Sequence, residues 1–320
     1  MPPLVSVIVT TYNSSRFVLE TLESAYRQTY PDIELIVSDD CSTDDTLALC
    51  QRWVSEHTGR FRRALCTQTP RNLGIVGNCN HAMAHATGQW LKYIAGDDLL
   101  LPNCVERLVA HIRPKTYLYS CGVHRWEMRN NRAYYVCLCL PDTCTWRQAR
   151  LMLKNLYLVP GPGLFVQRDR LASLGGFDTR FNTEDQIIVT KYLTLRQHVG
   201  VIHEPLVVWR IHGDNTSEHP FSPIMKPLKW QFYKAYVLRY CWRYALLLHG
   251  YHYFVDAYLC EYSRRCGLAR AAGYLLRAFD ILQWLPPMGR DHLNAITVVE
   301  SKDFVPPQCG AAALGNHTTP

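Results

Sequence analysis

The first hundred residues alternate short apolar runs with amphipathic segments, and this alternation restricts the fold more than any other feature. Nearly every residue within each of these runs is apolar, which is typical of strands buried on both faces of a sheet. They lie at residues 4–9, 33–37, 64–67 and 90–95. The segments between them carry apolar residues at helical spacing. Strand and helix in turn predict a mostly parallel, doubly wound α/β sheet.

Polar residues at the ends of the predicted strands also suggest where two helices begin. Ser14 or Ser15 can cap the helix that follows the first strand. Asp40, Ser42 and Thr43 can open the helix that follows the second strand. A third helix is expected to start near residue 78, after a glycine-containing turn.

The rest of the chain divides into three parts. The pattern predicts more strands and helices up to about residue 220, then helices rich in aromatic and basic residues, then a disordered tail. The expected elements are helices near 146–155 and 184–195 and strands near 199–202 and 206–211. The sequence thus predicts a first domain over residues 1–220, a helical appendage over 221–304 and a tail over 305–320.

The composition excludes several classes of protein. With 48% hydrophobic residues and 19% charged residues, the chain is too apolar to be intrinsically disordered. The 13 cysteines are odd in number and widely spread, and they form no CxxC pair. This usage predicts reduced thiols in a cytoplasmic protein rather than a disulfide framework or a zinc site.

Membrane and nucleic-acid partners are judged from hydropathy and charge. We expect no secretory signal and no membrane span, because no apolar stretch reaches the roughly 18 residues that a span requires. The aromatic and basic residues of 221–304 fit either peripheral contact with a membrane surface or a helical cap on the first domain. A net charge of +7 without a dense basic run argues against nucleic acid.

Polar clusters follow all four predicted strands and should meet at one edge of the sheet. They lie at residues 10–13, 39–42, 71–74 and 96–98. The adjacent carboxylates of Asp97 and Asp98 would repel each other unless a cation offsets their charge. Hard oxygen ligands without a His/Cys pattern favour Mg²⁺ or Mn²⁺, whose shell a substrate diphosphate can complete. The sequence therefore predicts a site for a metal ion and a diphosphate.

Six short motifs in order make the pattern specific. They read SVIVTTYN at 6–13, VSDDCSTD at 37–44, RNLG at 71–74, GDD at 96–98, GGFD at 175–178 and ED at 184–185. In order and spacing, over residues 4–215, they resemble the family 2 glycosyltransferases. That resemblance implies the nucleotide-sugar transferase sandwich of the GT-A type as the fold.

The resemblance also implies which residues bind the donor. The expected donor-binding residues are Thr10, Tyr12, Asn13, Asp40, Arg71, Asp97 and Arg210. Among them, Tyr12 would stack on the base and Asp40 would accept a hydrogen bond from a base N–H. Asp97 would contact the ribose hydroxyls, and Arg210 would reach the diphosphate.

Two further residues are expected to hold the metal ion. By the same resemblance Asp98 would bind Mn²⁺ or Mg²⁺, and His212 could be an additional ligand. Many relatives carry another Asp at the position of Ala95, so the site in this chain rests on fewer carboxylates.

The acid–base chemistry is expected at the start of the helix near 184–195. The resemblance implies that Asp185 is the catalytic base of an inverting displacement and that Glu184 positions the acceptor or the sugar. A helix N-terminus favours the ionised carboxylate that a base requires, although the same placement could simply satisfy the helix dipole.

These expectations together describe an inverting glycosyltransferase. It would move a sugar from a nucleotide diphosphate donor, with UDP favoured, to a hydroxyl of a polysaccharide or glycolipid acceptor in cell-surface polysaccharide synthesis. Two alternatives remain open at this point: a sugar nucleotidyltransferase, and a non-catalytic module that binds nucleotide sugars.

Overall fold

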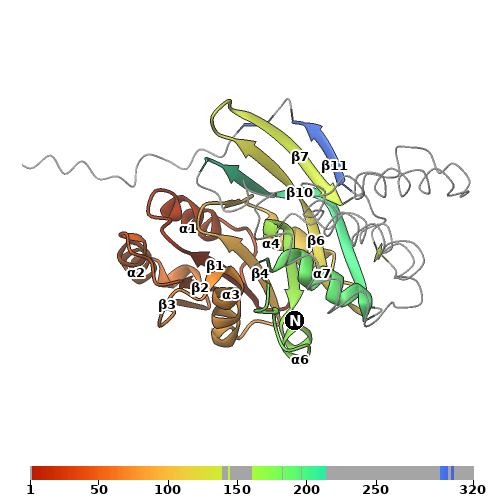
Figure 1. Ribbon diagram of the computed structural model, residues 1–320, viewed down its shortest axis with the longest axis horizontal. Coiled ribbons are helices and arrows are strands. Elements are labelled where there is room, and N and C mark those ends of the chain that lie inside the picture. The colour runs from red at the N-terminus through yellow and green to blue at the C-terminus, as the bar shows by residue number, and fades with distance from the viewer. Residues whose placement is uncertain are drawn as a thin grey trace, which may run out of the picture.

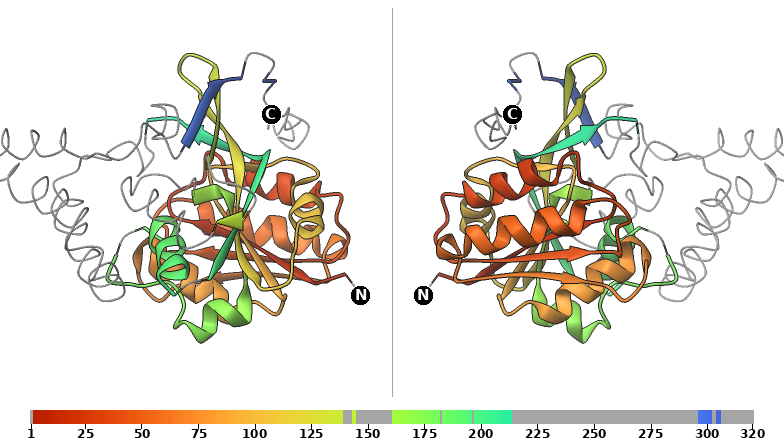
Figure 2. Two further views of the ribbon diagram at one scale, coloured as in Figure 1. Left: turned by 90° about the vertical axis from the view of Figure 1, so that its right-hand side faces the viewer. Right: turned by 90° about the vertical axis from the view of Figure 1, so that its left-hand side faces the viewer.

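A twisted mixed β-sheet runs through the described part of the chain and carries helices on both faces (Figures 1 and 2). The computed structural model describes residues 2–138, 143–144, 161–181, 183–195, 197–213, 296–301 and 304–305. The strands are β1 (Val5–Thr11), β2 (Ile33–Asp39), β3 (Arg63–Gln68), β4 (Trp90–Ala95), β5 (Leu99–Leu100), β6 (Thr116–Glu127), β7 (Arg132–Leu138), β8 (Thr143–Cys144), β9 (Leu164–Gln167), β10 (His198–Ile211) and β11 (Ile296–Glu300). The α-helices are α1 (Val18–Tyr26), α2 (Thr46–Glu56), α3 (Gly74–His85), α4 (Cys104–Ala110), α6 (Arg168–Ser173) and α7 (Asp185–Thr194). The short 3₁₀ helices are η1 (Thr58–Arg60) and η2 (Gly161–Gly163).

The parallel half of the sheet has the order β4-β1-β2-β3, as the alternating pattern predicts. Beyond β4 the strands β9, β6, β7 and β11 follow, and each pairs antiparallel to its neighbour. β10 lies parallel to β6 and antiparallel to β5. The mixed α/β class and its mostly parallel, doubly wound core are confirmed.

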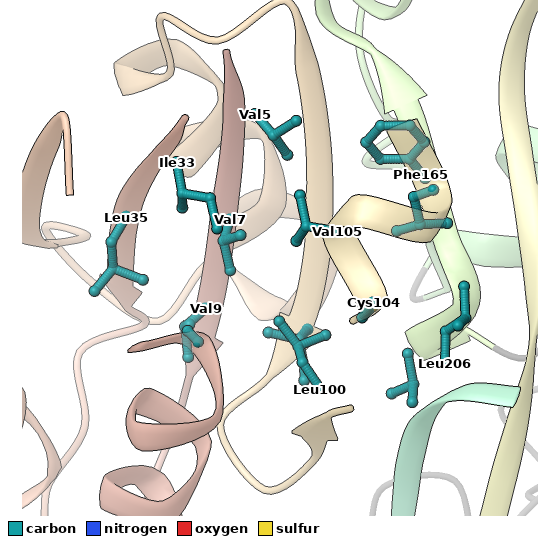
Figure 3. Close-up of a cluster of buried hydrophobic side chains, with 14 of the residues drawn as sticks. Val5, Val7, Val9, Ile33, Leu35, Leu100, Cys104, Val105, Phe165 and Leu206 are labelled. Atoms are coloured by element: carbon teal, nitrogen blue, oxygen red, sulfur yellow. The ribbon is translucent and has the colours of Figure 1, made fainter. Parts of the chain in front are cut away.

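Each face of the sheet has its own hydrophobic core. Val5, Val7 and Val9 point toward one face, where residues of α1, α2 and α4 pack against them. Figure 3 shows this cluster, with Cys104 and Val105 of α4 beside the strands. Ile8 points to the opposite face, which α3, α6 and α7 cover. Burial on both faces explains why the central strands are nearly uniformly apolar.

Two predictions for the later strands are wrong in detail. The expected strands at 199–202 and 206–211 are one strand, β10, whose pairing with β6 shifts register between Ile202 and Pro205. Within the part expected to be helical, Ile296–Glu300 forms β11 on the edge of β7. The predicted helix at 146–155 and most of the appendage at 221–304 lie outside the described residues, as does the tail beyond residue 305.

Helix starts also differ from the predictions. Neither Ser14 nor Ser15 caps α1 through its side chain; the backbone carbonyl of Ser14 accepts the first hydrogen bonds instead. α2 begins later than expected, and the carboxylate of Asp44 accepts the Thr46 N–H. α3 begins earlier, at Gly74, where φ is +74°.

Two properties of the described residues bear on compartment and membrane contact. Cys41, Cys50, Cys66, Cys79, Cys104, Cys121 and Cys137 are free. In the described part of the chain, no helix is long and apolar enough to cross a membrane.

A buried carboxylate joins β1, β2 and the segment before β4. Glu34 is fully buried and accepts hydrogen bonds from Ser6, Thr87 and Arg63. Burial acts to raise its pKa, but these hydrogen bonds prevail and hold the pKa of Glu34 below its usual value.

We predict that Glu34→Gln lowers the free energy of unfolding at pH 7 by about 1 to 3 kcal/mol, because hydrogen-bond donors lose their charged partner. Since the pKa of Glu34 is lower in the folded chain, its contribution is complete above the unfolded value and is lost as the pH falls through the folded value. Urea unfolding at several pH values tests this. A deficit that does not shrink in acid would contradict it.

Candidate active site

The loops that follow β1, β2, β3 and β4 contact one another at the carboxyl end of the parallel strands. The Asn13 N–H donates to Ser42 Oγ at 2.9 Å, and the Gly96 N–H donates to the Thr10 carbonyl at 2.8 Å. The Leu73 N–H donates to Asp40 Oδ1 at 2.8 Å. The prediction that these four clusters converge on one edge is confirmed.

Asn13 joins the first two loops. Its backbone adopts a left-handed conformation with φ +50°, and its Oδ1 accepts hydrogen bonds from Thr43 N and Oγ1. Gly96 packs so closely against the first loop that an added Cβ would lie 2.8 Å from the methyl group of Thr11. These contacts fix the shape of the loops before any ligand binds.

The residues predicted to bind the nucleobase come from the end of β1 and from the loops after β1, β2 and β3. Asp40 is buried, and its Oδ1 also bonds with Thr69 Oγ1 at 2.9 Å. Asp40 Oδ1 thus accepts hydrogen bonds from Leu73 N and Thr69 Oγ1, so Oδ2 is the oxygen that can accept a hydrogen bond from a ligand. Tyr12 exposes 48% of its surface and Arg71 is exposed, whereas Thr10 is half-buried.

Asp97 and His212 face each other at the neighbouring part of the edge. Asp97 Oδ2 and His212 Nε2 are 3.1 Å apart, and both side chains remain partly exposed. The Phe17 ring packs against the imidazole with centroids 4.4 Å apart. We call these two residues the Asp97–His212 pair.

Asp98, the next residue after Asp97, is buried. It is 2% exposed, and its Oδ1 accepts the Arg210 N–H at 2.8 Å. Burial, followed by the charge of Asp97, raises the pKa of Asp98. The backbone of Arg210 thus holds Asp98 Oδ1, and it is the more exposed Asp97 carboxylate, not that of Asp98, that lies beside His212.

Arg210 is also placed differently from the prediction. It is 1% exposed, and its guanidinium donates to the Glu20 carboxylate and to the Asp97 carbonyl. Its Cζ lies 4.8 Å from the centroid of the Phe17 ring. These contacts make Arg210 a support for Asp97 and Asp98, not a group that can reach a bound diphosphate.

Glu184 and Asp185 lie at the start of α7 and form a second acidic site, which we call the carboxylate pair. A Cβ added at Gly161 would lie 3.1 Å from Asp185 Oδ2 and 3.4 Å from Glu184 Oε1, so η2 packs directly against both side chains. Burial, together with the charge of Asp185, raises the pKa of Glu184 to about 8.

The carboxylate pair and Asp40 share one neighbour. Burial, followed by the charges of Glu184, Asp185 and Asp40, raises the pKa of the Cys79 thiol in α3. Cys79 of α3 is therefore close enough to both Asp40 and the carboxylate pair for their charges to act on its thiol.

Two residues of this region were missed by the sequence analysis. Thr69 is a small residue whose hydrogen bond to Asp40 appears only in three dimensions. The second is Arg129, which is exposed on the turn between β6 and β7. Its Nη2 would lie 3.0 Å from a Cβ added at Gly213, the residue that follows His212. Its position in a long hairpin gives no sequence signal.

Comparison with known proteins assigns this arrangement to a family. The model of "Glycosyl transferase family 2" matches residues 6–168. The chain belongs to glycosyltransferase family 2. This family assignment confirms the resemblance based on the six motifs.

Individual relatives agree with the family. A putative glycosyltransferase, EpsE, of Bacillus subtilis is 36% identical over 38% of this chain and 42% of its own length. An uncharacterized glycosyltransferase of Rickettsia typhi is 26% identical over 67% of this chain and 66% of its own. A UDP-Glc:alpha-D-GlcNAc-diphosphoundecaprenol beta-1,3-glucosyltransferase, WfaP, of Escherichia coli is 30% identical over 37% of this chain and 44% of its own. The chain thus matches less than two thirds of the length of each of these relatives.

Solved structures share the fold. TarS of Staphylococcus aureus, residues 1–349 in complex with UDP-GlcNAc, gives a TM-score of 0.55 at 18% identity over 80% of this chain and 79% of that one. The mannosyltransferase PcManGT of Pyrobaculum calidifontis, in complex with GDP-Man and Mn²⁺, gives 0.51 at 24% identity over 90% and 82%. These similarities confirm the nucleotide-sugar transferase sandwich expected from the resemblance.

Arg210→Met should lower the free energy of unfolding by about 2 to 4 kcal/mol, because it removes a buried guanidinium that pairs with Glu20 and whose charge acts on the buried Asp98 carboxylate. Urea denaturation measures the loss. Arg129→Met is the matched control, since it removes an exposed guanidinium from the same region and should change stability little. Equal effects of the two substitutions would contradict the structural role of Arg210.

Proposed function

We propose that the chain is an inverting glycosyltransferase that moves a sugar from a UDP-linked donor to a hydroxyl of a polysaccharide or lipid-linked saccharide. The observation that carries the proposal is the placement of Asp40, the Asp97–His212 pair and the carboxylate pair at one end of the sheet. The relative WfaP is described as using UDP-Glc on a diphosphoundecaprenol-linked acceptor. TarS, whose fold is similar, binds UDP-GlcNAc.

The donor lies across the loops after β1, β2 and β3 in this proposal. Asp40 Oδ2 accepts the N3–H of uracil, because Thr69 and Leu73 already hold Oδ1. Tyr12 is exposed enough to stack on the base, and Arg71 and Thr10 lie on the same edge. Asn13 shapes the pocket through Thr43 instead of contacting the base.

The Asp97–His212 pair fits a divalent metal ion, Mn²⁺ or Mg²⁺. A carboxylate oxygen and an imidazole nitrogen 3.1 Å apart are a donor set that Mn²⁺ accepts, and a donor diphosphate can supply further ligands. In the described residues, no group of three or more acidic, histidine or cysteine side chains could hold a metal ion alone. Bound there, the ion would neutralise charge on the leaving diphosphate.

Arg129 supplies a positive charge near this pair. Its guanidinium is exposed beside Gly213, so it can approach a diphosphate held at His212. It thereby takes the role that the sequence analysis gave to Arg210.

The carboxylate pair performs the proton transfer. With the pKa of Glu184 raised to about 8, the pair retains one proton near neutral pH. Asp185 is then the ionised base that takes the proton of the acceptor hydroxyl, and protonated Glu184 donates a hydrogen bond to the sugar or acceptor. The start of α7 favours the charged form of Asp185.

Location and membrane contact remain predictions. We propose a cytoplasmic protein in which the aromatic and basic part at 221–304 contacts the membrane peripherally. This part lies almost entirely outside the described residues, and flotation with anionic vesicles tests it.

Asp97→Asn or His212→Ala should abolish the increase in UDP affinity that Mn²⁺ produces, because each removes a metal ligand. Isothermal titration with and without Mn²⁺ measures this increase. Asp98→Asn is the matched control from the same turn. Asp98→Asn should retain the metal effect, because Asn can still accept the Arg210 N–H. If Asp98→Asn loses the metal effect and the Asp97 and His212 variants keep it, Asp98 is the ligand.

Asp185→Asn should lower kcat for sugar transfer by at least about 10³-fold and leave UDP affinity within twofold of the wild type, because the base does not contact the nucleotide. Release of UDP from a panel of nucleotide sugars provides the assay. A variant with near-normal turnover would contradict the assignment.

Glu184→Gln provides the control within the carboxylate pair. In the wild type, kcat should decline above about pH 8, where Glu184 loses its proton. The amide of the variant keeps an N–H donor and cannot titrate, so this decline should disappear while part of the activity remains.

A further inference from the structure

A lysine side chain lies buried in the core, on a strand whose other buried side chains are apolar or aromatic. Lys92 of β4 is fully buried, and its Nζ donates hydrogen bonds to backbone carbonyls only. The acceptors are the carbonyls of Tyr93 at 3.2 Å, of Leu164 at 3.4 Å and of Pro162. Among the described residues, no carboxylate forms an ion pair with it.

A buried ammonium group is costly unless its surroundings compensate the charge. The carbonyl oxygens do so in part, and the charge of Lys92 also acts on the buried carboxylate of Asp98. A leucine or isoleucine at this position would fill a strand buried on both faces without that cost. The lysine therefore needs an explanation beyond packing.

The acceptors of Lys92 supply that explanation. Pro162 belongs to η2, and Leu164 begins β9, so the ammonium group holds this turn against β4. The other side of the turn faces α7, where Gly161 touches both members of the carboxylate pair. Gly163 fits against the Cys121 carbonyl, 2.6 Å from an added Cβ, so the turn has little freedom to shift on its β6 side.

We propose that Lys92 is a positioning residue, which holds the Gly161–Gly163 turn so that Gly161 packs against Asp185 and Glu184. The turn limits how far the two carboxylates can move and excludes water from one side of them. This inference rests on the proposed function for its catalytic consequence. The contact between Lys92 and the turn does not depend on it.

Lys92→Met is the direct test, since methionine fills similar space without the ammonium group. Hydrogen exchange of the peptide that covers residues 161–167 should become faster. Transfer assays should show kcat reduced about 10- to 100-fold with UDP affinity within twofold of the wild type, as expected for displaced catalytic groups. The decline of kcat near pH 8 should move to lower pH, because a loosened turn lets water reach Glu184.

Two further variants separate this role from a general loss of stability. Gly161→Ala leaves Lys92 intact but pushes on the carboxylates, and should produce a similar loss of kcat with normal UDP affinity. Lys191→Met is the matched control, because Lys191 also donates to the carbonyls of a turn, those of Leu174 and Gly176, away from η2. It should lower stability and leave both kcat and exchange at 161–167 within twofold of the wild type.

The outcomes distinguish the two levels of the proposal. Unchanged exchange at 161–167 in Lys92→Met would overturn the inference, and so would a kcat within twofold of the wild type. A parallel loss of kcat and UDP affinity would also overturn it, because that indicates collapse of the whole site. Absence of sugar transfer by the wild type would overturn the proposed function, while the exchange measurement would still test whether Lys92 holds the turn.

Discussion

The buried contact between Asp98 and Arg210 joins the two parts of the sheet on which the site depends. Asp98 follows the parallel strand β4, and Arg210 lies near the end of β10, more than a hundred residues later. A carboxylate that is 2% exposed requires donors and a nearby cation, and Arg210 supplies both. Because the Arg210 guanidinium also holds the Asp97 carbonyl and Glu20 of α1, three elements meet at this point. Asp97 and His212 face each other as a result.

The carboxylate pair, which is the second acidic site, is also held in place by a neighbouring element. α7 carries the carboxylate pair, and η2 packs against it from the side of β4. Lys92 lies within β4, and Asp97 and Asp98 lie in the turn that follows β4. β4 thus supports the Asp97–His212 pair at its carboxyl end, and through Lys92 it contacts η2, the turn beside the carboxylate pair. In the function that we propose, metal binding and proton transfer would therefore both depend on this central strand of the sheet.

The sequence predicts the parallel half of the fold well, because strands buried on both faces must be continuously apolar. It also predicts that polar loops after these strands converge, since parallel strands end at one edge. It does not show which of two adjacent carboxylates is buried, and for this reason our proposal uses Asp97 as the metal ligand where the sequence predicted Asp98. The burial of Arg210 depends on a long-range contact that no local pattern encodes. Lys92, in contrast, is a visible anomaly in an apolar run and could have been identified from the sequence.

A crystal structure of the chain with Mn²⁺ and UDP, with anomalous scattering used to locate manganese, tests the central claim most directly. Our account predicts one manganese peak in contact with both Asp97 and His212, with Asp98 still bonded to the backbone of Arg210. Manganese bound by Asp98, or UDP bound with no manganese between Asp97 and His212, would contradict it.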